Sequence, residues 1–449
     1  MPGVEVTDAD VLVVGAGSAG AVVAARCSED PGCRVLLVEA GPDQRAVDTP
    51  AAITGPSFQS ALALPGRTWP DLLATRAAGQ EPRAYLRGRG TGGSSAVNAM
   101  VALPGHPDDY DEWATVHGCA GWSWADVAPW FERLPIPLHP ALEAERGAVS
   151  RALLAADPRA APALLTRTTA GRRAAADAVY LEPARSRPNL TVRGDALVDR
   201  VLIAGRRTRG VVLADGTELT APTVVVSAGT IHSPAILLRS GVDRPGLGAN
   251  LHDHPSYPLV IALRDPADVA GLAISVLAQH TSGAAPDDLQ LLAMDYADTA
   301  SPGLGILLVG LMRSRSRGTV RLACDDPAID PVVDFAMLTD EADCVALRTG
   351  VELAERVLDT PPFAAIGEVV EHDTSDAGLR AAVGDYVHAV GTCRMGAADD
   401  PAAVVDPRGR VIGYDGLVVC DASIMPIVPR ANTHLPTVML AERIAATLR

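Results

Sequence analysis

The feature that most constrains the fold is a glycine cluster near the start of the chain, in the stretch DVLVVGAGSAGAVVAARC. A short apolar run ends at Gly15, the cluster GAGSAG spans residues 15–20, and a helical pattern of small and apolar residues follows. A second apolar run ends at Glu39, 19 residues after Gly20. This order predicts a strand, helix and strand unit with a buried parallel sheet.

The same spacing predicts a ligand. Glycines after a strand allow a tight turn and let the backbone approach a pyrophosphate at the helix N-terminus, where free N–H groups favour negative charge. Glu39 stands where an acid accepts hydrogen bonds from ribose hydroxyls, and an acid there disfavours a 2′-phosphate. We therefore predict a site for NAD or FAD rather than NADP, in preference to an ordinary glycine turn.

Charge and composition exclude several function classes. The 38 basic residues are all Arg, and 54 acidic residues bring the formal net charge to −16. Without Lys the chain cannot form a pyridoxal Schiff base or a Walker-type phosphate site, and its negative charge argues against nucleic acid as a partner. The seven cysteines form no CxxC pair, which indicates reduced thiols rather than zinc ligands.

The sequence also argues against membrane insertion and export. Its longest early apolar stretch, residues 11–25, contains three glycines and is shorter than the roughly 20 residues that a membrane helix needs. The first ten residues carry acids where a secretory signal carries basic residues. We expect no membrane partner and a cytoplasmic location.

Three further motifs follow in order along the chain. They are LRGRGTGGSSAVNAM from Leu86, followed by HPDDYDEW; SAGTIHSP from Ser227, followed by GANLHDHP; and HAVGTCRMG from His388, followed by DASIMPIVPRANTHLPTVMLAERIA. With the first glycine cluster, they resemble the signatures of the glucose-methanol-choline (GMC) flavoprotein oxidoreductases. The resemblance runs from residue 10 to the end of the chain, and only residues 134–170 lack a clear counterpart, where the chain is shorter.

The resemblance implies FAD in an extended conformation, with adenosine on the first glycine cluster and isoalloxazine under the loop from Gly92 to Met100. Some relatives attach the flavin to a His in the first signature, but residues 94–98 contain no His, so we expect noncovalent FAD. The implied cofactor-binding residues are Gly15, Gly17, Ser18, Ala19, Gly20, Glu39, Ala40, Arg87, Gly92, Gly93, Ser94, Asn98, Ala99, Met100, Val101, Val198, Asp421, Ala422 and Thr433.

Changes of pattern predict an α/β fold of two domains. We expect a Rossmann-like FAD-binding domain with a parallel sheet, and an α+β substrate domain built on an antiparallel sheet. The expected elements include a helix over 95–100, an antiparallel meander that returns to the first sheet at 224–226, a long helix over 340–358 and a final helix. The expected boundaries are 1–133, 173–255 and 388–449 for the FAD-binding domain, 134–172 for a connecting or lid segment, and 256–387 for the substrate-binding domain.

The resemblance also implies a catalytic pair. His388 lies in the stretch that matches the family's active-site His, and a neutral imidazole beside a substrate hydroxyl can accept its proton. The family's second active-site residue is His or Asn, and counting from Asp421 places Asn432 there, where its amide would orient the alkoxide. His434, two residues later, is the alternative for this role.

His252 and His254 lie two positions apart around Asp253, a spacing that resembles a metal site. We expect structural hydrogen bonding and no metal, because no third ligand is evident and relatives carry a similar sequence without a metal.

Together these observations predict an enzyme that oxidises a CH–OH group of a small-molecule alcohol to an aldehyde or ketone by hydride transfer to flavin N5, with O₂ or another acceptor reoxidising the flavin. Two alternatives remain open: a GMC-type hydroxynitrile lyase and a non-catalytic flavin-binding protein. The shortened segment near 134–170 suggests a wide entrance for a bulky alcohol, such as a sugar-like or natural-product intermediate.

Overall fold

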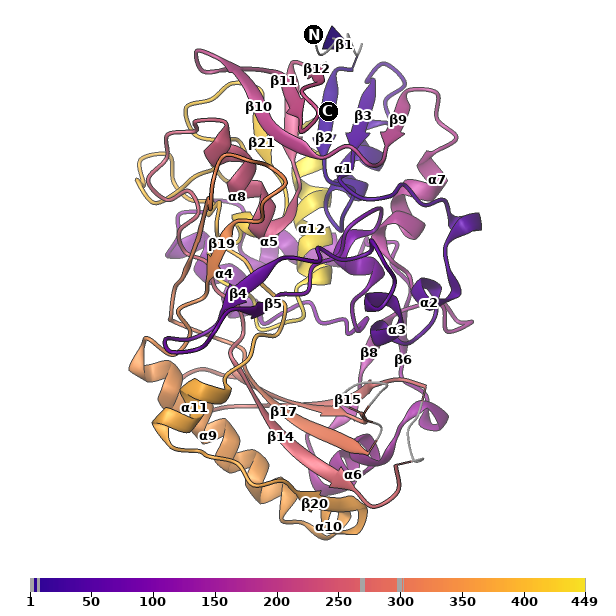
Figure 1. Cartoon of the computed structure of the whole chain (residues 1–449), viewed down its shortest axis with the longest axis vertical. Helices are drawn as coiled ribbons and strands as arrows, with labels where there is room; N and C mark the ends of the chain where they lie inside the picture. Colours follow the sequence, from indigo (N-terminus) through magenta and orange to yellow (C-terminus); the bar gives the residue numbers. More distant parts are fainter. Residues whose placement is uncertain (1–3, 6–8, 267–270, 297–300, 302, 449) are drawn as a thin grey trace.

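A computed structural model describes the chain except for residues 1–3, 6–8, 267–270, 297–300, 302 and 449. A five-stranded parallel sheet lies in the upper part of the molecule and combines segments from the beginning, middle and end of the chain (Figure 1). The Rossmann-like sheet predicted from the sequence is confirmed. Its strands, in spatial order, are β21 (Leu417–Val419), β13 (Thr223–Val226), β2 (Val11–Val14), β3 (Val35–Val38) and β9 (Leu190–Arg193).

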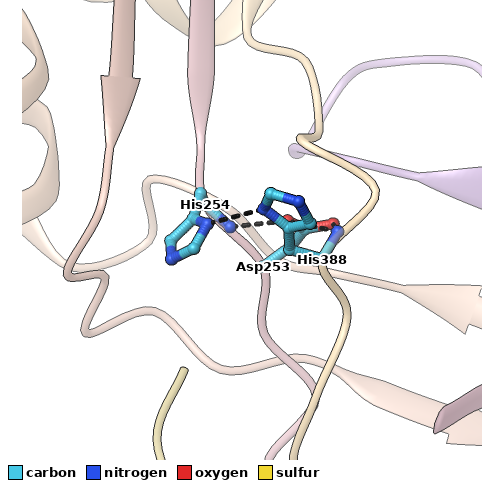
Figure 2. Close-up of side chains that lie close together, drawn as sticks. All are labelled: Asp253, His254 and His388. Atoms are coloured by element: carbon cyan, nitrogen blue, oxygen red, sulfur yellow. Dashed lines mark hydrogen bonds between the residues drawn. The ribbon is translucent and has the colours of Figure 1, made fainter. Parts of the chain in front are cut away.

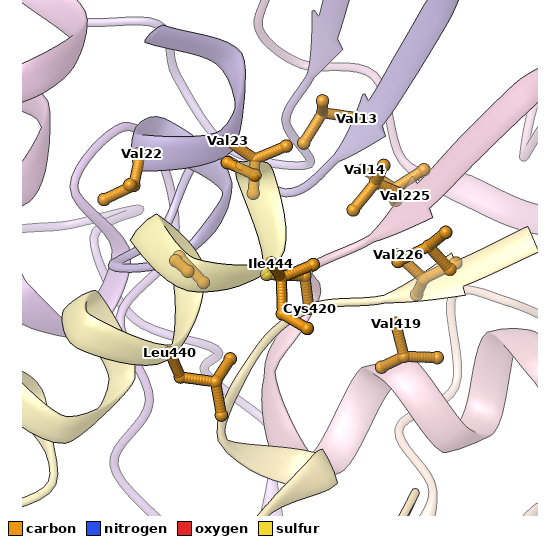
Figure 3. Close-up of a cluster of buried hydrophobic side chains, with 14 of the residues drawn as sticks. Val13, Val14, Val22, Val23, Val225, Val226, Val419, Cys420, Leu440 and Ile444 are labelled. Atoms are coloured by element: carbon orange, nitrogen blue, oxygen red, sulfur yellow. The ribbon is translucent and has the colours of Figure 1, made fainter. Parts of the chain in front are cut away.

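This sheet is buried because its strands are short runs of Val and Leu. Every residue of β2 and β3 is buried, as expected for parallel strands that helices cover. The helices α1 (Gly20–Cys27) and α12 (His434–Ala445) pack on the sheet, and Figure 3 shows their side chains meeting the strand valines. The core thereby fixes the carboxyl ends of β2, β3 and β13, from which the glycine turn, Glu39 and the loop at Ser227 continue.

A smaller sheet lies beside the first. Its strands β10, β11 and β12 form the predicted antiparallel meander, and β13 then returns to the parallel sheet before α8 (Gly229–Arg239). The spatial order is β1 (Val4–Glu5), β12 (Glu218–Thr220), β11 (Arg207–Leu213) and β10 (Val198–Ala204).

The lower part of the molecule is built on a six-stranded sheet, with α6 and α9 to α11 around it (Figure 1). The four long strands pair antiparallel, and the predicted long helix is α9, so the expected α+β layout is confirmed. The strands in order are β20 (Gly367–Val369), β14 (Ser256–Leu263), β17 (Leu304–Leu311), β16 (Leu289–Met294), β15 (Ile274–His280) and β7 (Ala161–Pro162). The helices are α6 (Ala148–Ala156), α9 (Glu341–Leu358), α10 (Pro361–Ile366) and α11 (Asp376–Ala382).

Residues 134–172, expected to be a connecting or lid segment, are structured and contribute to this lower part. Here β6 (Leu138–Pro140) pairs with β8 (Leu164–Thr166), β7 extends the six-stranded sheet, and α6 packs beneath it. Helix α6 forms because Val149, Ala152 and Leu153 place a buried apolar face at helical spacing.

The helix expected over 95–100 is a single 3₁₀ turn, Gly93–Ala96. The turn follows Gly92 and begins at Gly93, and both glycines have a positive φ. A helix cannot continue to residue 100, because Met100 has a φ of 62°.

The remaining helices and strands lie between the five-stranded and the six-stranded sheet and around the five-stranded sheet. No helix of the described residues is long and apolar enough to cross a bilayer. The elements are β4 (Leu73–Thr75), β5 (Arg83–Ala84), β18 (Thr319–Arg321) and β19 (Val332–Asp334), which form a four-stranded sheet, and the helices α2 (Ala51–Thr54), α3 (Phe58–Leu62), α4 (Pro107–Thr115), α5 (Trp124–Phe131) and α7 (Glu182–Ala184).

Candidate active site

A cavity of about 390 Å³ begins at the carboxyl ends of the parallel strands and reaches the face of the six-stranded sheet. It brings together most of the residues predicted from the sequence, including His388 and Asn432. The predicted cofactor residues that line it are Gly15, Gly17, Ser18, Ala19, Glu39, Ala40, Arg87, Gly93, Ser94, Asn98, Ala99, Met100, Val101, Val198, Asp421, Ala422 and Thr433.

The glycine turns at the upper end are required by close backbone contacts. Gly15 has a φ of +95°, and a Cβ there would lie 2.6 Å from the carbonyl oxygen of Ser227. The two glycine loops touch at Gly17 and Gly93, since a Cβ on Gly93 would lie 2.7 Å from the Gly17 Cα. Side chains at these positions would fill the space between the loops or push the loops apart.

Gly20 and Gly92 are not among the cavity-lining residues and have a packing role instead. A Cβ on Gly20 would lie 1.8 Å from the Gly15 carbonyl oxygen, so this glycine lets α1 approach β2. A Cβ on Gly92 would lie 2.5 Å from Oδ1 of Asp177. Both glycines thus allow the close packing that supports the cavity wall, although neither lines the cavity.

Glu39 is buried at the end of β3 and joins three backbone segments. Its Oε2 accepts a hydrogen bond from the Ala16 N–H at 2.7 Å, and its Oε1 accepts from the N–H groups of Gly41 and Gly90, each at 2.9 Å. The carboxylate is therefore held rigidly at the cavity edge, where its remaining lone pairs can accept hydrogen bonds from ribose hydroxyls.

At the other end of the cavity, Asn432 Nδ2 lies 3.4 Å from His388 Nε2. The two residues come from different segments, since Asn432 stands just before α12 and His388 follows Val387, whose φ is 55°. His434, the alternative to Asn432, is also buried and lines the cavity. The side chain that contacts the His388 ring is, however, that of Asn432.

A hydrogen-bond chain determines which nitrogen of His388 carries a proton. Nε2 of His254 lies 3.1 Å from the Pro429 carbonyl oxygen, which can only accept, so His254 is protonated at Nε2. Nδ1 of the neutral His254 is then an acceptor, and it lies 3.1 Å from Nδ1 of His388 (Figure 2). His388 must therefore donate from Nδ1, and its Nε2 keeps a lone pair beside the Asn432 amide.

The backbone of His388 is fixed by a second set of bonds. Both carboxylate oxygens of Asp253 accept from the His388 N–H at 3.0 Å (Figure 2). The hydroxyl of Tyr85 donates to Asp253 at 3.1 Å and accepts from the Ala389 N–H at 3.3 Å. His388 is thus held at both its ring and its main chain. The sequence predicted structural hydrogen bonding for His254 but not that its partner is His388, and it gave no role to Tyr85 or Asp253.

Burial keeps both imidazoles neutral. It lowers the pKa of His388 well below its usual 6.5, and the positive charge of Arg87 lowers it further. Burial likewise lowers the pKa of His254 to about 3. The ring of His388 is therefore neutral across the physiological pH range.

The described residues contain one group of potential metal ligands with donor atoms close together, Asp253, His254 and His388. Their donor atoms already have partners: the two Nδ1 atoms bond each other, and the Asp253 oxygens accept from backbone N–H groups and Tyr85. We interpret this cluster as a hydrogen-bonded support for His388, although His388 is the third potential ligand that the sequence did not reveal.

Several buried polar atoms along the cavity have no hydrogen-bond partner among the residues that the structure describes. They are Oγ of Ser227, Oδ1 of Asn432 and both ring nitrogens of His434. Buried polar atoms are rarely left unpaired in native proteins, so these indicate contacts with a bound ligand. Ser227 was not in the predicted set, although the motif SAGTIHSP that begins with it was a signal for this loop.

A glycine-rich dinucleotide cavity that ends at an imidazole and amide pair is the arrangement of a nucleotide-dependent oxidoreductase. Solved structures support this class. The crystal structure of pyridoxine 4-oxidase from Mesorbium loti superposes with a TM-score of 0.89 at 28% identity, covering 98% of this chain and 99% of that chain.

Sequence comparisons identify the family. The N- and C-terminal models of the GMC oxidoreductases match residues 9–256 and 314–441, and the chain belongs to this family. It is 34% identical to 5-(hydroxymethyl)furfural oxidase of Methylovorus sp. (strain MP688), over 97% of this chain and 98% of that protein. It is 32% identical to the oxygen-dependent choline dehydrogenase of Klebsiella pneumoniae (strain 342), over 98% of this chain and 96% of that protein.

GMC oxidoreductases bind FAD, and the cavity fits this cofactor. The contact between Gly17 and Gly93 leaves backbone rather than side chains where a pyrophosphate could bind, and Glu39 could accept hydrogen bonds from the ribose. At the opposite end, the orphaned nitrogens of His434 stand at the N-terminus of α12, where a flavin carbonyl or ring nitrogen can bind. Residues 94–98 offer no His, Cys or Tyr for a covalent link.

Proposed function

We propose that the chain oxidises the CH–OH group of an alcohol to a carbonyl, with His388 as the acceptor of the hydroxyl proton. When bound, FAD supplies the hydride acceptor, its N5 atom. The observation that carries the proposal is the neutral His388, whose Nε2 lone pair stands in the cavity 3.4 Å from the Asn432 amide. The relatives named above, which act on 5-(hydroxymethyl)furfural, choline or pyridoxine, support an alcohol as substrate.

In this proposal the two side chains bind one substrate oxygen. Nε2 of His388 accepts the hydroxyl proton, and the Asn432 amide donates a hydrogen bond to the same oxygen as negative charge develops on it. The Asn432 amide does not take up a proton at neutral pH, so it orients the oxygen without competing with His388 for the proton.

The test is anaerobic mixing of the purified FAD-loaded chain with a panel of alcohols. Bleaching of the yellow flavin supports the proposal, and peroxide formed on admission of air identifies O₂ as an acceptor. Flavin that stays yellow with every alcohol, while a cyanohydrin releases its aldehyde, would favour the lyase. Flavin that stays yellow with no product from either would favour a non-catalytic flavin-binding protein.

The pH dependence of flavin reduction follows from the lowered pKa of His388. The base is neutral above its pKa, so at saturating substrate the reduction rate should remain constant as the pH falls through 6.5. At pH 5.5 the rate should be within about twofold of its value at pH 8, whereas an imidazole of ordinary pKa would be about tenfold more protonated than neutral. Stopped-flow absorbance across this range checks the prediction, and a midpoint near 6.5 would contradict it.

His254 is expected to act as a positioning residue. His254→Leu removes the acceptor for the His388 Nδ1 proton, which frees the imidazole to take the tautomer that cannot accept at Nε2. We expect flavin reduction to slow by about 10- to 100-fold, the usual effect of removing a partner that orients a functional His. His254→Asn keeps an acceptor oxygen near the position of Nδ1 and should restore most of the rate. Equal loss in both variants, at equal FAD content, would contradict this role.

A further inference from the structure

The substrate end of the cavity has an apolar wall formed by one face of the six-stranded sheet. Ile274 of β15, Leu292 and Met294 of β16 and Leu308 of β17 line it. Leu292 is paired with Leu308 across β16 and β17, and Ile274 is paired with Met294, so the four side chains share a face. The alternate residues of these strands point away from the cavity, into the core between the sheet and the helices α6 and α9.

Two aromatic rings complete this wall. Tyr386 lies beside His388, with ring centroids 5.1 Å apart, and Phe58 of α3 packs in the same apolar cluster. The Tyr386 hydroxyl donates to Oε1 of Gln290 at 2.8 Å. Tyr386 therefore presents its ring, and not its hydroxyl, to the cavity.

The acidic residues that line the cavity are already engaged. Asp385 is paired with Arg76 at 2.6 Å, and Asp421 accepts from the Gly229 N–H and the Ser233 hydroxyl. Glu39 is bonded to three N–H groups at the opposite end. Among the described residues, the sheet wall thus has no carboxylate to balance the charge of a cationic substrate.

We propose that the substrate is an uncharged aryl-methanol, an alcohol whose CH₂OH group is attached to an aromatic or heteroaromatic ring. This inference rests on the proposed function and extends it to the substrate class. The ring binds between the sheet wall and the side chains of Phe58 and Tyr386, while the CH₂OH group reaches His388 and Asn432. The alcohol loses a hydride to FAD and its hydroxyl proton to Nε2 of His388, and the product is the aryl aldehyde.

The wall disfavours two other classes of alcohol. A quaternary ammonium would lose its hydration without a carboxylate on the wall to balance its charge. A sugar would bury several further hydroxyls against side chains that neither donate nor accept hydrogen bonds. An aryl ring needs neither a counter-charge nor hydrogen-bond partners, because burial of its apolar surface is favourable and its edge packs well against other aromatic rings.

The first experiment uses the FAD-loaded chain under anaerobic conditions with 4-methoxybenzyl alcohol, choline and glucose. We expect the second-order rate constant of flavin reduction to be at least about 100-fold higher for the aryl alcohol than for the other two, given the penalty for burying a charge or unpaired hydroxyls. Faster reduction by choline or by glucose would overturn the substrate class while leaving alcohol oxidation intact.

The second experiment measures binding without turnover, so that it remains informative if no alcohol reduces the flavin. We expect 4-methoxybenzaldehyde to perturb the absorption spectrum of the bound flavin, and Leu308→Glu and Met294→Glu each to weaken this binding by at least about tenfold. The matched control is Leu304→Glu, on the same strand as Leu308 but exposed at the start of that strand and outside the cavity lining, which should bind normally.

The outcomes of the two experiments separate the claims. Absence of flavin reduction with every alcohol would refute the proposed function, and intact aldehyde binding that Leu308→Glu abolishes would still support the aryl-binding wall. An aldehyde that does not bind, or that binds equally to all variants with normal FAD content, would refute the aryl-binding wall whatever the alcohols do.

Discussion

His388→Ala should slow flavin reduction by an alcohol by about 10²- to 10⁴-fold, the usual contribution of a general base, while FAD remains bound. The loss follows from removal of the Nε2 lone pair that stands beside Asn432. FAD should stay because the glycine loops and Glu39 form the opposite end of the cavity. Anaerobic stopped-flow measurement of flavin bleaching, at matched FAD content, gives the rate.

Two controls distinguish loss of the base from a structural defect. His139→Ala, at a partly exposed position on β6 that does not line the cavity, should leave the rate unchanged. Added imidazole should restore part of the rate of His388→Ala, because a free base can occupy the vacated space. An unchanged rate in His388→Ala would refute the role of this residue and favour the non-catalytic alternative.

Gly93→Ala should abolish FAD binding. The new Cβ would lie 2.7 Å from the Gly17 Cα, a contact with backbone that neither loop can relieve by rotating a side chain. The loops must separate, and the backbone surface that would hold the pyrophosphate is lost with their contact. Absorbance at the flavin maximum per mole of protein, after reconstitution with excess FAD, measures the loss.

The matched control is Gly171→Ala. Gly171 also has a positive φ, +75°, but a Cβ there would have no atom of the described part of the chain within 4 Å. Both substitutions carry the same kind of backbone strain, roughly 1 kcal/mol, so the difference between them isolates the steric collision. Full FAD occupancy in Gly93→Ala would contradict the proposed contact between the two loops and the cofactor.

Local patterns predicted the parallel sheet and the residues at its edge. The runs VLVV and VLLV with the glycine turn between them encode β2, α1 and β3, so Glu39 could be placed at the cavity edge from spacing alone. The pair of His388 and Asn432 came from family resemblance, since 44 residues separate them and no periodicity relates them.

The support for His388 could not be predicted in this way. His254 is 134 residues distant from His388 in the sequence, and Tyr85 is 168 residues from Asp253. Such contacts depend on how β14 and the loop after α11 meet in three dimensions, which no local pattern encodes. The 3₁₀ turn at Gly93–Ala96 was missed because left-handed backbone conformations, rather than side-chain periodicity, determine it.

The attachment of His388 also links it to the segment that carries Asn432. Its imidazole contacts Nδ1 of His254, and its backbone N–H donates to Asp253, both directly before β14. Nε2 of the same His254 lies 3.1 Å from the carbonyl oxygen of Pro429, three residues before Asn432. One buried imidazole therefore sets the spacing of the two side chains that, in the proposed mechanism, hold the substrate oxygen.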